Sequence, residues 1–363
     1  MVFDLNVSRG ERIERLQADS PMTGHEVLCL VGREEDGEMI MAWRVNRILR
    51  PMGWVVDEDA DVEFVDMSSF EGTEIYRRTL TFLLVLACRK AVGKNIVVRY
   101  SMNDSYYCEF PDDVVTEAQV AEIKNEMKKL VELALPIQMT ILPLDKARRI
   151  FERQGNEDKA RLIQWTGVDP VAVYRCAGSY GYFGGPLAAS TSVVHNFDLN
   201  HYAPGLLLRF PAITDINSLP PLAVVPKLMD VFREYSKWLS VLGLSTMDSL
   251  HERVSKGQSL ELILISEAFH SEALSRIARE IIGRKGVRLV CLAGPSSSGK
   301  TTTSKRLAIQ LSVSGMRPVA LALDDYYVDR ARTPRDENGK YDFEALEALD
   351  LELVNEHLEA LSS

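Results

Sequence analysis

The feature that most constrains this chain is a glycine-rich segment near its C-terminal end, which reads GPSSSGKTT from Gly294 to Thr302. An apolar run, Leu289 to Ala293, comes directly before it, and a stretch of helix-forming residues follows. Two glycines at this spacing let a backbone approach phosphate oxygens closely, and the N–H groups at the start of the helix then point toward them. The pattern therefore predicts a strand, a phosphate-binding loop and a helix in succession.

Within this loop, each residue type has an expected task. Lys300 can supply a mobile positive charge to the outer phosphates, and the hydroxyl of Thr301 is placed to bind Mg²⁺. The alternative is a Gly/Ser turn that contains Lys-Thr by chance, but the strand and helix on either side favour the phosphate loop. ATP and Mg²⁺ are thus the predicted cofactors. The residues expected to hold the nucleotide are Gly294, Pro295, Ser296, Ser297, Ser298, Gly299, Lys300, Thr301 and Thr302.

A second apolar run, Val319 to Leu323, predicts a buried parallel strand with Asp324 at its carboxyl end. Ligands of open α/β sheets bind outside the carboxyl ends of the strands, so Asp324 is expected to face the nucleotide. Its carboxylate could act as a general base or bind Mg²⁺, and the sequence does not separate these two roles. A third alternative is an aspartate that only caps the next turn.

The segments LDDYYVDR and YDFEALEALD, together with the phosphate loop, resemble the uridine kinase and phosphoribulokinase family. The resemblance implies ATP-dependent transfer of a phosphoryl group to a nucleoside 5′-hydroxyl, with Lys300 and Asp324 as catalytic residues. Tyr327 and Glu344 stand where the family contacts the acceptor nucleoside; Tyr327 could instead be a packing residue, and Glu344 replaces an aspartate. Residues 285–363 make about 80 residues, whereas such a domain takes on the order of 150–200, so we expect an incomplete kinase domain.

The N-terminal residues 1–68 have the pattern of a small β-rich module. Met39 to Val45 is strand-like, Asn46-Arg47 marks a turn, and Asp61 to Val65 alternates polar and apolar residues as a half-buried strand does. The stretch VNRILRPMGWVVDEDADVEFVDM resembles the TGS module of threonyl-tRNA synthetases. The resemblance implies a ubiquitin-like β-grasp fold.

Residues 69–215 form a larger α+β region. Apolar residues at helical spacing predict a helix over Ile75–Ala91 that stops at Gly93, and the capping box Thr116 to Gln119 opens another. The segments SYYCEF, YRCAGSYGYFGGPLAAST and FDLNHYAPGLLLRF resemble the second additional domain of threonyl- and alanyl-tRNA synthetases. That resemblance implies a domain in which mischarged tRNA is hydrolysed.

The metal ligands of that family are largely missing here. Its H-x-x-x-H motif aligns with Tyr76 and Leu80, and its C-x-x-x-H motif aligns with Cys176 and Tyr180. One cysteine without imidazoles does not make a zinc site, so we expect the fold without zinc and without editing chemistry. Two nearby histidines are expected to be surface residues rather than ligands: His195 and His201.

Composition restricts the remaining possibilities. The formal net charge of -10 argues against non-specific affinity for nucleic acid or anionic membranes, although it leaves room for a local basic face. The five scattered cysteines suggest no disulfide framework and fit a reducing cytoplasm. No signal peptide or apolar run long enough to span a membrane is recognisable. Amphipathic stripes between residues 216 and 284 predict a helical connector.

The fold expected from the sequence is therefore multidomain, of the α+β and α/β classes. Its parts are a β-grasp module at 1–68, a synthetase-like α+β domain at 69–215, the helical connector at 216–284 and part of a phosphate-loop kinase domain at 285–363. The predicted function is a nucleoside kinase for uridine or cytidine. The alternative is a nucleotide-sensing, RNA- or tRNA-binding regulatory protein without catalysis, and the missing metal ligands disfavour an editing-type hydrolase.

Overall fold

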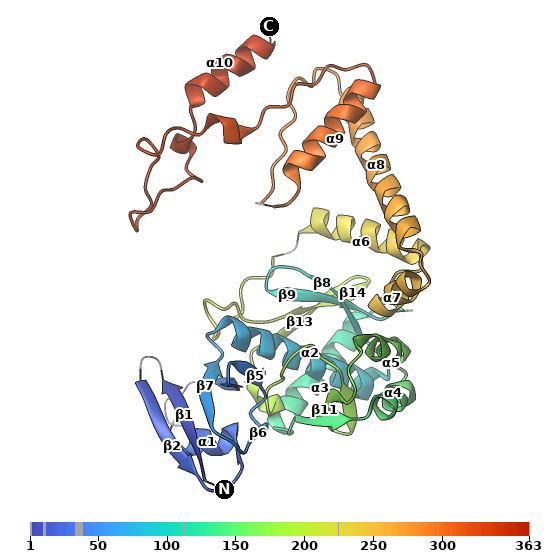
Figure 1. Ribbon diagram of the computed structural model, residues 1–363. Coiled ribbons are helices and arrows are strands. Elements are labelled where there is room, and N and C mark those ends of the chain that lie inside the picture. The colour runs from blue at the N-terminus through green and yellow to red at the C-terminus, as the bar shows by residue number, and fades with distance from the viewer. Residues whose placement is uncertain are drawn as a thin grey trace. The chain divides into compact units, whose positions relative to one another are not determined.

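The computed structural model describes residues 2–9, 12–32, 39–111, 113–223, 225–295 and 297–362 (Figure 1). The chain divides into two compact units, Met1–Glu252 and Arg253–Ser363. The first unit contains several sheets and the helices that cover them, whereas the described part of the second is made of helices joined by extended segments. Among the described residues, no helix combines the length and apolar character needed to cross a membrane.

The first unit begins with a five-stranded sheet in the order β2-β1-β7-β4-β5. Its central pair, β1 and β7, is parallel, and the other neighbours are antiparallel. Helix α1 (Gly24–Leu30) begins with a capping box between Thr23 and Glu26 and packs on this sheet around the fully buried Trp43. The strands are β1 (Phe3–Arg9), β2 (Arg12–Ala18), β4 (Ile40–Val45), β5 (Ile48–Arg50) and β7 (Ala60–Asp66), with the short pair β3 (Met22–Thr23) and β6 (Val55–Val56) beside them.

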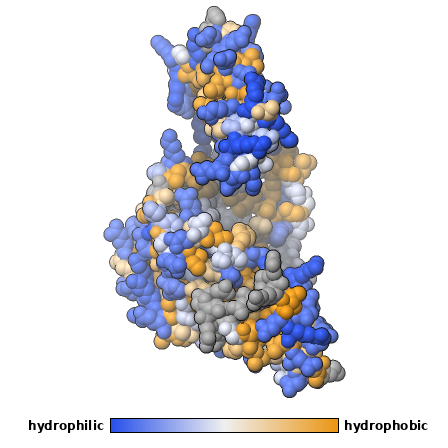
Figure 2. Space-filling model, turned by 90° about the vertical axis from the view of Figure 1, so that its left-hand side faces the viewer, coloured by the Kyte–Doolittle hydropathy of each residue, from blue (hydrophilic) through white to orange (hydrophobic). Residues whose placement is uncertain are grey.

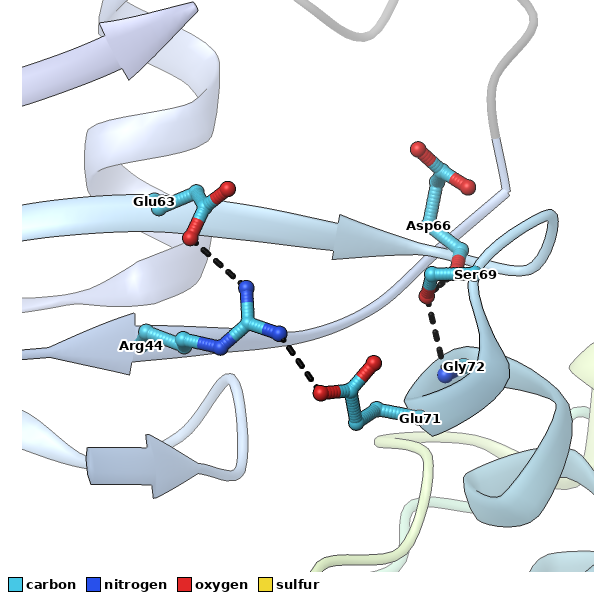
Figure 3. Close-up of polar contacts among 6 residues, drawn as sticks. All are labelled: Arg44, Glu63, Asp66, Ser69, Glu71 and Gly72. Atoms are coloured by element: carbon cyan, nitrogen blue, oxygen red, sulfur yellow. Dashed lines mark hydrogen bonds and ion pairs between the residues drawn. The ribbon is translucent and has the colours of Figure 1, made fainter. Parts of the chain in front are cut away.

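An ion-pair bridge joins this sheet to the helix that follows it (Figure 3). Arg44 on β4 contacts Glu63 on β7 at 2.6 Å and Glu71 in the first turn of α2 at 2.8 Å. Burial alone would lower the pKa of Arg44, but the hydrogen bonds to both carboxylates raise it. Ser69 caps the helix by accepting a hydrogen bond of 3.0 Å from the N–H of Gly72.

Helix α2 (Phe70–Val92) is the central element of the first unit. It ends at Gly93, whose left-handed backbone (φ 69°) fits the glycine C-cap that the sequence predicts. The helix packs against α3 (Glu117–Glu132), and α3 carries the predicted capping box at Thr116. A four-stranded antiparallel sheet shares the same core, with the order β13 (Asp198–Tyr202), β14 (Gly205–Arg209), β9 (Ser105–Glu109) and β8 (Val97–Ser101).

A three-stranded sheet carries the next group of helices. Its strands are β10 (Gln138–Leu142), β11 (Val171–Cys176) and β12 (Ser179–Gly181), paired antiparallel. The fully buried Phe151 and Ile163 belong to the core between this sheet and its helices. Those helices are α4 (Leu144–Arg153), α5 (Glu157–Leu162) and the 3₁₀ turn η2 (Ile163–Thr166).

Helices α6 (Pro226–Val241) and α7 (Met247–Ser255) follow the sheets. Met229 of α6 is fully buried in a cluster with Met102, Tyr107 and Leu207. The ring of Phe232 stacks on Tyr100 with a centroid distance of 4.4 Å. These two residues of the predicted apolar stripe therefore pack helix α6 against the four-stranded sheet, whereas Val231, Tyr235 and Val241 of the same helix are exposed.

In the second unit, helix α8 (Ser259–Gly283) packs against α9 (Lys300–Val313). Arg306 links them by an ion pair of 2.6 Å to Glu267. Helix α10 (Leu351–Ser362) lies against η4 (Leu323–Tyr326), where the Tyr326 hydroxyl is 2.8 Å from Nδ1 of His357. Apolar side chains are also exposed around α10, as the upper part of Figure 2 shows, and they include Leu346, Leu351, Leu353 and Leu361.

Two predicted strands of this unit are not formed. Residues Leu289–Ala293 and Val319–Leu323 have no strand structure, and Leu289 and Val319 are 61% and 63% exposed. A parallel strand needs neighbouring strands to pair its backbone groups and cover its side chains. The described residues of the second unit contain no strand that could do so, which explains why the apolar runs stay extended. The predicted helix after the glycine-rich loop is confirmed.

Candidate functional site

The glycine-rich loop wraps around its own lysine. Gly299 has a left-handed backbone (φ 84°) directly before α9, and Ser297 has φ 60°. The ammonium group of Lys300 donates hydrogen bonds to the carbonyl oxygens of Gly294 at 2.7 Å and Pro295 at 2.9 Å. A Cβ on Gly294 would lie only 2.8 Å from Oγ of Ser298. The left-handed backbone thus favours a glycine at position 299, whereas a side chain at position 294 would require the Ser298 hydroxyl to move.

The remaining predicted loop residues lie on the surface. Pro295, Ser297, Ser298, Thr301 and Thr302 are exposed, so their polar groups are open to a ligand. Ser296 lies outside the described residues. The loop presents hydroxyl groups and the first N–H groups of α9 on an open surface, which is chemistry that suits an anion.

The predicted acceptor residues make no hydrogen bond or ion pair to this loop among the described residues. Asp324 is exposed within the 3₁₀ turn η4, so it does not stand at the end of a strand as expected. Tyr327 donates a hydrogen bond of 3.3 Å to the carbonyl oxygen of Phe343, and Glu344 is exposed. In the part of the chain that the structure describes, no hydrogen bond or ion pair links Lys300 or Thr301 to Asp324.

A different arrangement is found at the four positions that align with the synthetase metal ligands. Tyr76 and Leu80 lie one turn apart on α2, Cys176 ends β11 and Tyr180 is on β12. The first three are no more than 2% exposed and belong to one hydrophobic core. The Tyr76 hydroxyl donates to the carbonyl oxygen of Asn196 at 2.7 Å and accepts from its N–H at 3.0 Å. These positions are therefore filled by packing and by backbone hydrogen bonds.

Burial determines the electrostatics of these positions. Burial raises the pKa of Tyr76 above its usual value and raises the pKa of the Cys176 thiol to about 11. A thiol with that pKa is protonated at neutral pH, and a metal binds the thiolate. The described ranges hold no group of three or more His, Cys, Asp or Glu side chains that could bind a metal. Of the two loop histidines, His195 is exposed, and His201 lies 2.8 Å from the carbonyl oxygen of Val115.

Cationic side chains surround the neighbouring segment 180–186, and the sequence reasoning missed them. Arg78 donates to the carbonyl oxygen of Pro186 at 3.2 Å, and Arg89 donates to Oε1 of Gln154 at 3.1 Å. Nζ of Lys159 lies 5.6 Å from the ring centroid of Phe183. Burial lowers the pKa of all three cations, whose hydrogen-bond and ring partners here are neutral. Arg78 and Arg89 both lie within the apolar pattern of α2. Basic residues inside such a pattern were the sequence signal that could have revealed this group of cations.

Comparison with known proteins identifies threonine–tRNA ligases as relatives. The chain is 28% identical over 174 residues to the threonine–tRNA ligase of Thermotoga neapolitana, which is 47% of this chain and 27% of that protein. It is 27% identical over 190 residues to the enzyme of Acidithiobacillus ferrooxidans, which is 52% of this chain and 29% of that protein. No family model matches the chain. The chain thus spans little more than a quarter of the length of these curated relatives.

These relatives correct the functional prediction. The resemblance to threonyl-tRNA synthetases is confirmed by them, whereas the resemblance to uridine kinases finds no support. The prediction of a nucleoside kinase, a phosphotransferase acting on uridine or cytidine, is wrong, because the relatives carry the name of a tRNA ligase, a different enzyme class. The kinase prediction rested on a short loop motif, on the segments LDDYYVDR and YDFEALEALD, and on two strands that are not formed. The RNA- or tRNA-binding alternative fits these relatives better.

Proposed function

We propose that this chain is a tRNA-binding protein that uses a synthetase-like domain without its editing chemistry. The similarity to threonine–tRNA ligases supports tRNA as the ligand. The main support for a lack of editing catalysis is that Tyr76 and Leu80 pack in the core at positions where the resemblance implies metal-binding histidines. A hydrophobic core and a phenol bonded to backbone groups cannot activate water.

The chemistry of the surrounding residues supports binding rather than hydrolysis. Cys176, the one position of the four that keeps the expected residue type, is a buried neutral thiol and a poor nucleophile. The half-buried Arg78 and Lys159 have no carboxylate within bonding distance among the described residues, so they can attract an anion. The phosphates of RNA are such anions. Hydrolysis would need a metal-bound water or a reactive nucleophile, and the described residues at these positions provide neither.

We further propose that the glycine-rich loop binds a nucleoside triphosphate, with Mg²⁺ at Thr301, and transfers no phosphoryl group. Lys300 now pairs with two neutral carbonyl oxygens, and a phosphate would offer it a stronger, charge-assisted partner. The left-handed Gly299 keeps the start of α9 open to such an anion. In this proposal the triphosphate is a regulatory ligand of the same chain that binds tRNA.

These proposals also revise the expected partners. The nucleoside acceptor predicted from the sequence is replaced by tRNA. A cytoplasmic location stays a prediction; it agrees with three cysteines that are buried and unpaired, namely Cys88, Cys108 and Cys176.

Filter binding of labelled tRNA to the full chain tests the main proposal. A DNA duplex of equal charge serves as the control for non-specific attraction, which the net charge of -10 should keep weak. We expect tRNA to bind more tightly than the duplex and the affinity to fall linearly on a log–log plot against salt. Equal binding of both nucleic acids, or none of tRNA, would contradict the proposal.

A further inference from the structure

A row of cations occupies the outward face of helix α4. Lys146, Arg149 and Arg153 are spaced i, i+3 and i+7, which places them along one stripe of the helix surface. All three side chains are exposed. We call these three residues the α4 stripe. At 1.5 Å per residue the stripe is about 10 Å long.

The opposite face fixes the helix in place. Ala147 and Phe151 are fully buried in the core of the three-stranded sheet. The N–H of Leu144 at the start of the helix donates a hydrogen bond of 3.0 Å to Oδ1 of Asp169. Helix α4 lies beside α5 at the edge of the first unit (Figure 1). The stripe is therefore presented to solvent from a firmly packed helix.

The cations of the stripe are not neutralised within the described chain. None of the three has an ion pair or a side-chain hydrogen bond to another described residue, whereas Arg148 on the same helix pairs with Glu152 at 3.4 Å. The stripe residues line a hollow of about 490 Å³ together with Pro143, Asp145 and Ile150. A single carboxylate faces three cations there, so the hollow keeps a net positive charge.

The form of the stripe favours a polyanion with regularly spaced charges. Nucleic-acid strands carry a phosphate about every 3.4 Å along the helix axis, so a 10 Å row can meet two or three successive phosphates. Lysine and arginine are the residues that contact such phosphates, and contacts of this kind position a protein without reading sequence. An acidic protein could also be attracted, but the similarity to tRNA ligases favours RNA.

We propose that the α4 stripe is a phosphate-backbone contact surface for tRNA, with each cation contacting one phosphate. This inference rests on the proposed tRNA binding and adds the surface that performs it. Each contact releases counterions from the RNA, and the slope of log affinity against log salt changes by about 0.7–0.9 per contact. Three contacts therefore account for a slope of about 2–3.

The test uses the full chain in three forms: wild type, a stripe variant with all three stripe residues changed to Gln, and a control variant. The control removes the same charge at three exposed cations elsewhere in the first unit: Arg47→Gln, Lys128→Gln and Lys227→Gln. Because all the changed side chains are exposed, both variants should keep the wild-type melting temperature. Filter binding of tRNA is measured between 50 and 200 mM salt.

We expect wild type to lose about 20- to 40-fold more affinity over this salt range than the stripe variant, and the control variant to follow wild type. An unchanged slope in the stripe variant, or an equal change in the control, would overturn the stripe proposal alone. Competition by polyglutamate as effective as that by tRNA would also overturn it and indicate an acidic protein partner. Absence of tRNA binding by wild type would overturn the proposed function and the stripe together.

Discussion

The substitution Tyr76→Phe tests whether the synthetase-like site has been converted to structural packing. The side chain is 2% exposed, and its hydroxyl bonds to both the N–H and the carbonyl oxygen of Asn196, which lies 120 positions later in the chain. Phenylalanine keeps the ring and its packing but removes both hydrogen bonds. If the phenol serves stability and not catalysis, the variant should be less stable and should bind tRNA as wild type does.

The expected loss follows from the two hydrogen bonds. Each contributes about 0.5–1.5 kcal/mol net, so their removal should cost about 2 kcal/mol. The cost stays near this value because Asn196 is half-buried and water can reach part of its backbone. In a unit of this size, about 2 kcal/mol corresponds to a fall of about 4–8 °C in the melting temperature.

Thermal unfolding followed by circular dichroism measures this change. Tyr235→Phe is the matched control, because that tyrosine is 54% exposed and its hydroxyl has no hydrogen-bond partner among the described residues. The control should melt as wild type does. A Tyr76→Phe variant with the wild-type melting temperature would refute the structural role that we assign to this hydroxyl.

The comparison of wild type with Tyr76→Phe also gives a prediction about the pH dependence of stability. Burial raises the folded-state pKa of Tyr76 above its usual value of about 10. The folded state therefore holds this proton more tightly than the unfolded state, so its contribution to stability is complete below pH 10 and is lost as the pH rises further. The difference in stability between wild type and Tyr76→Phe should shrink above pH 10. A difference in stability that grows above pH 10 would contradict the raised pKa of Tyr76 in the folded state.

Three further predictions concern other parts of the chain. Lys300→Ala should abolish binding of a fluorescent ATP analogue, measured by titration, because the loop loses its cation; retained binding would refute the triphosphate proposal. Arg44→Met should lower stability by about 1 kcal/mol or less, with a smaller effect in high salt, since its two carboxylate partners are partly exposed. Cys291 is exposed and should react with a thiol reagent at pH 8 much faster than the buried Cys176, whose pKa of about 11 keeps the thiolate scarce; equal rates would contradict the packing.

Much of the first unit could be predicted from its sequence because local chemistry and tertiary packing agree there. The capping box at Thr116, the glycine cap at Gly93 and the turn at Asn46-Arg47, where both residues have positive φ, are all present in the structure. Each of these signals depends on a few neighbouring residues. Such signals are satisfied by short-range hydrogen bonds and backbone angles, so a single sequence can reveal them.

The second unit was predicted less well for a physical reason. The run Val319–Leu323 has the composition of a buried strand, but strand formation depends on partners that lie far away in sequence. The position of Asp324 was inferred from that strand, and the residue lies instead in the 3₁₀ turn η4. The α4 stripe was missed for a different reason. Its three cations can be recognised as a surface only once the structure shows that they have no ion-pair partner among the described residues.

The most direct test of the account is to incubate the full chain with mischarged tRNA and follow both the complex and the aminoacyl ester. We predict a stable complex in which the ester hydrolyses no faster than it does in buffer, because the positions implied for the metal ligands are filled by Tyr76, Leu80 and Tyr180. Accelerated ester hydrolysis, or no complex at low salt, would contradict the central claim.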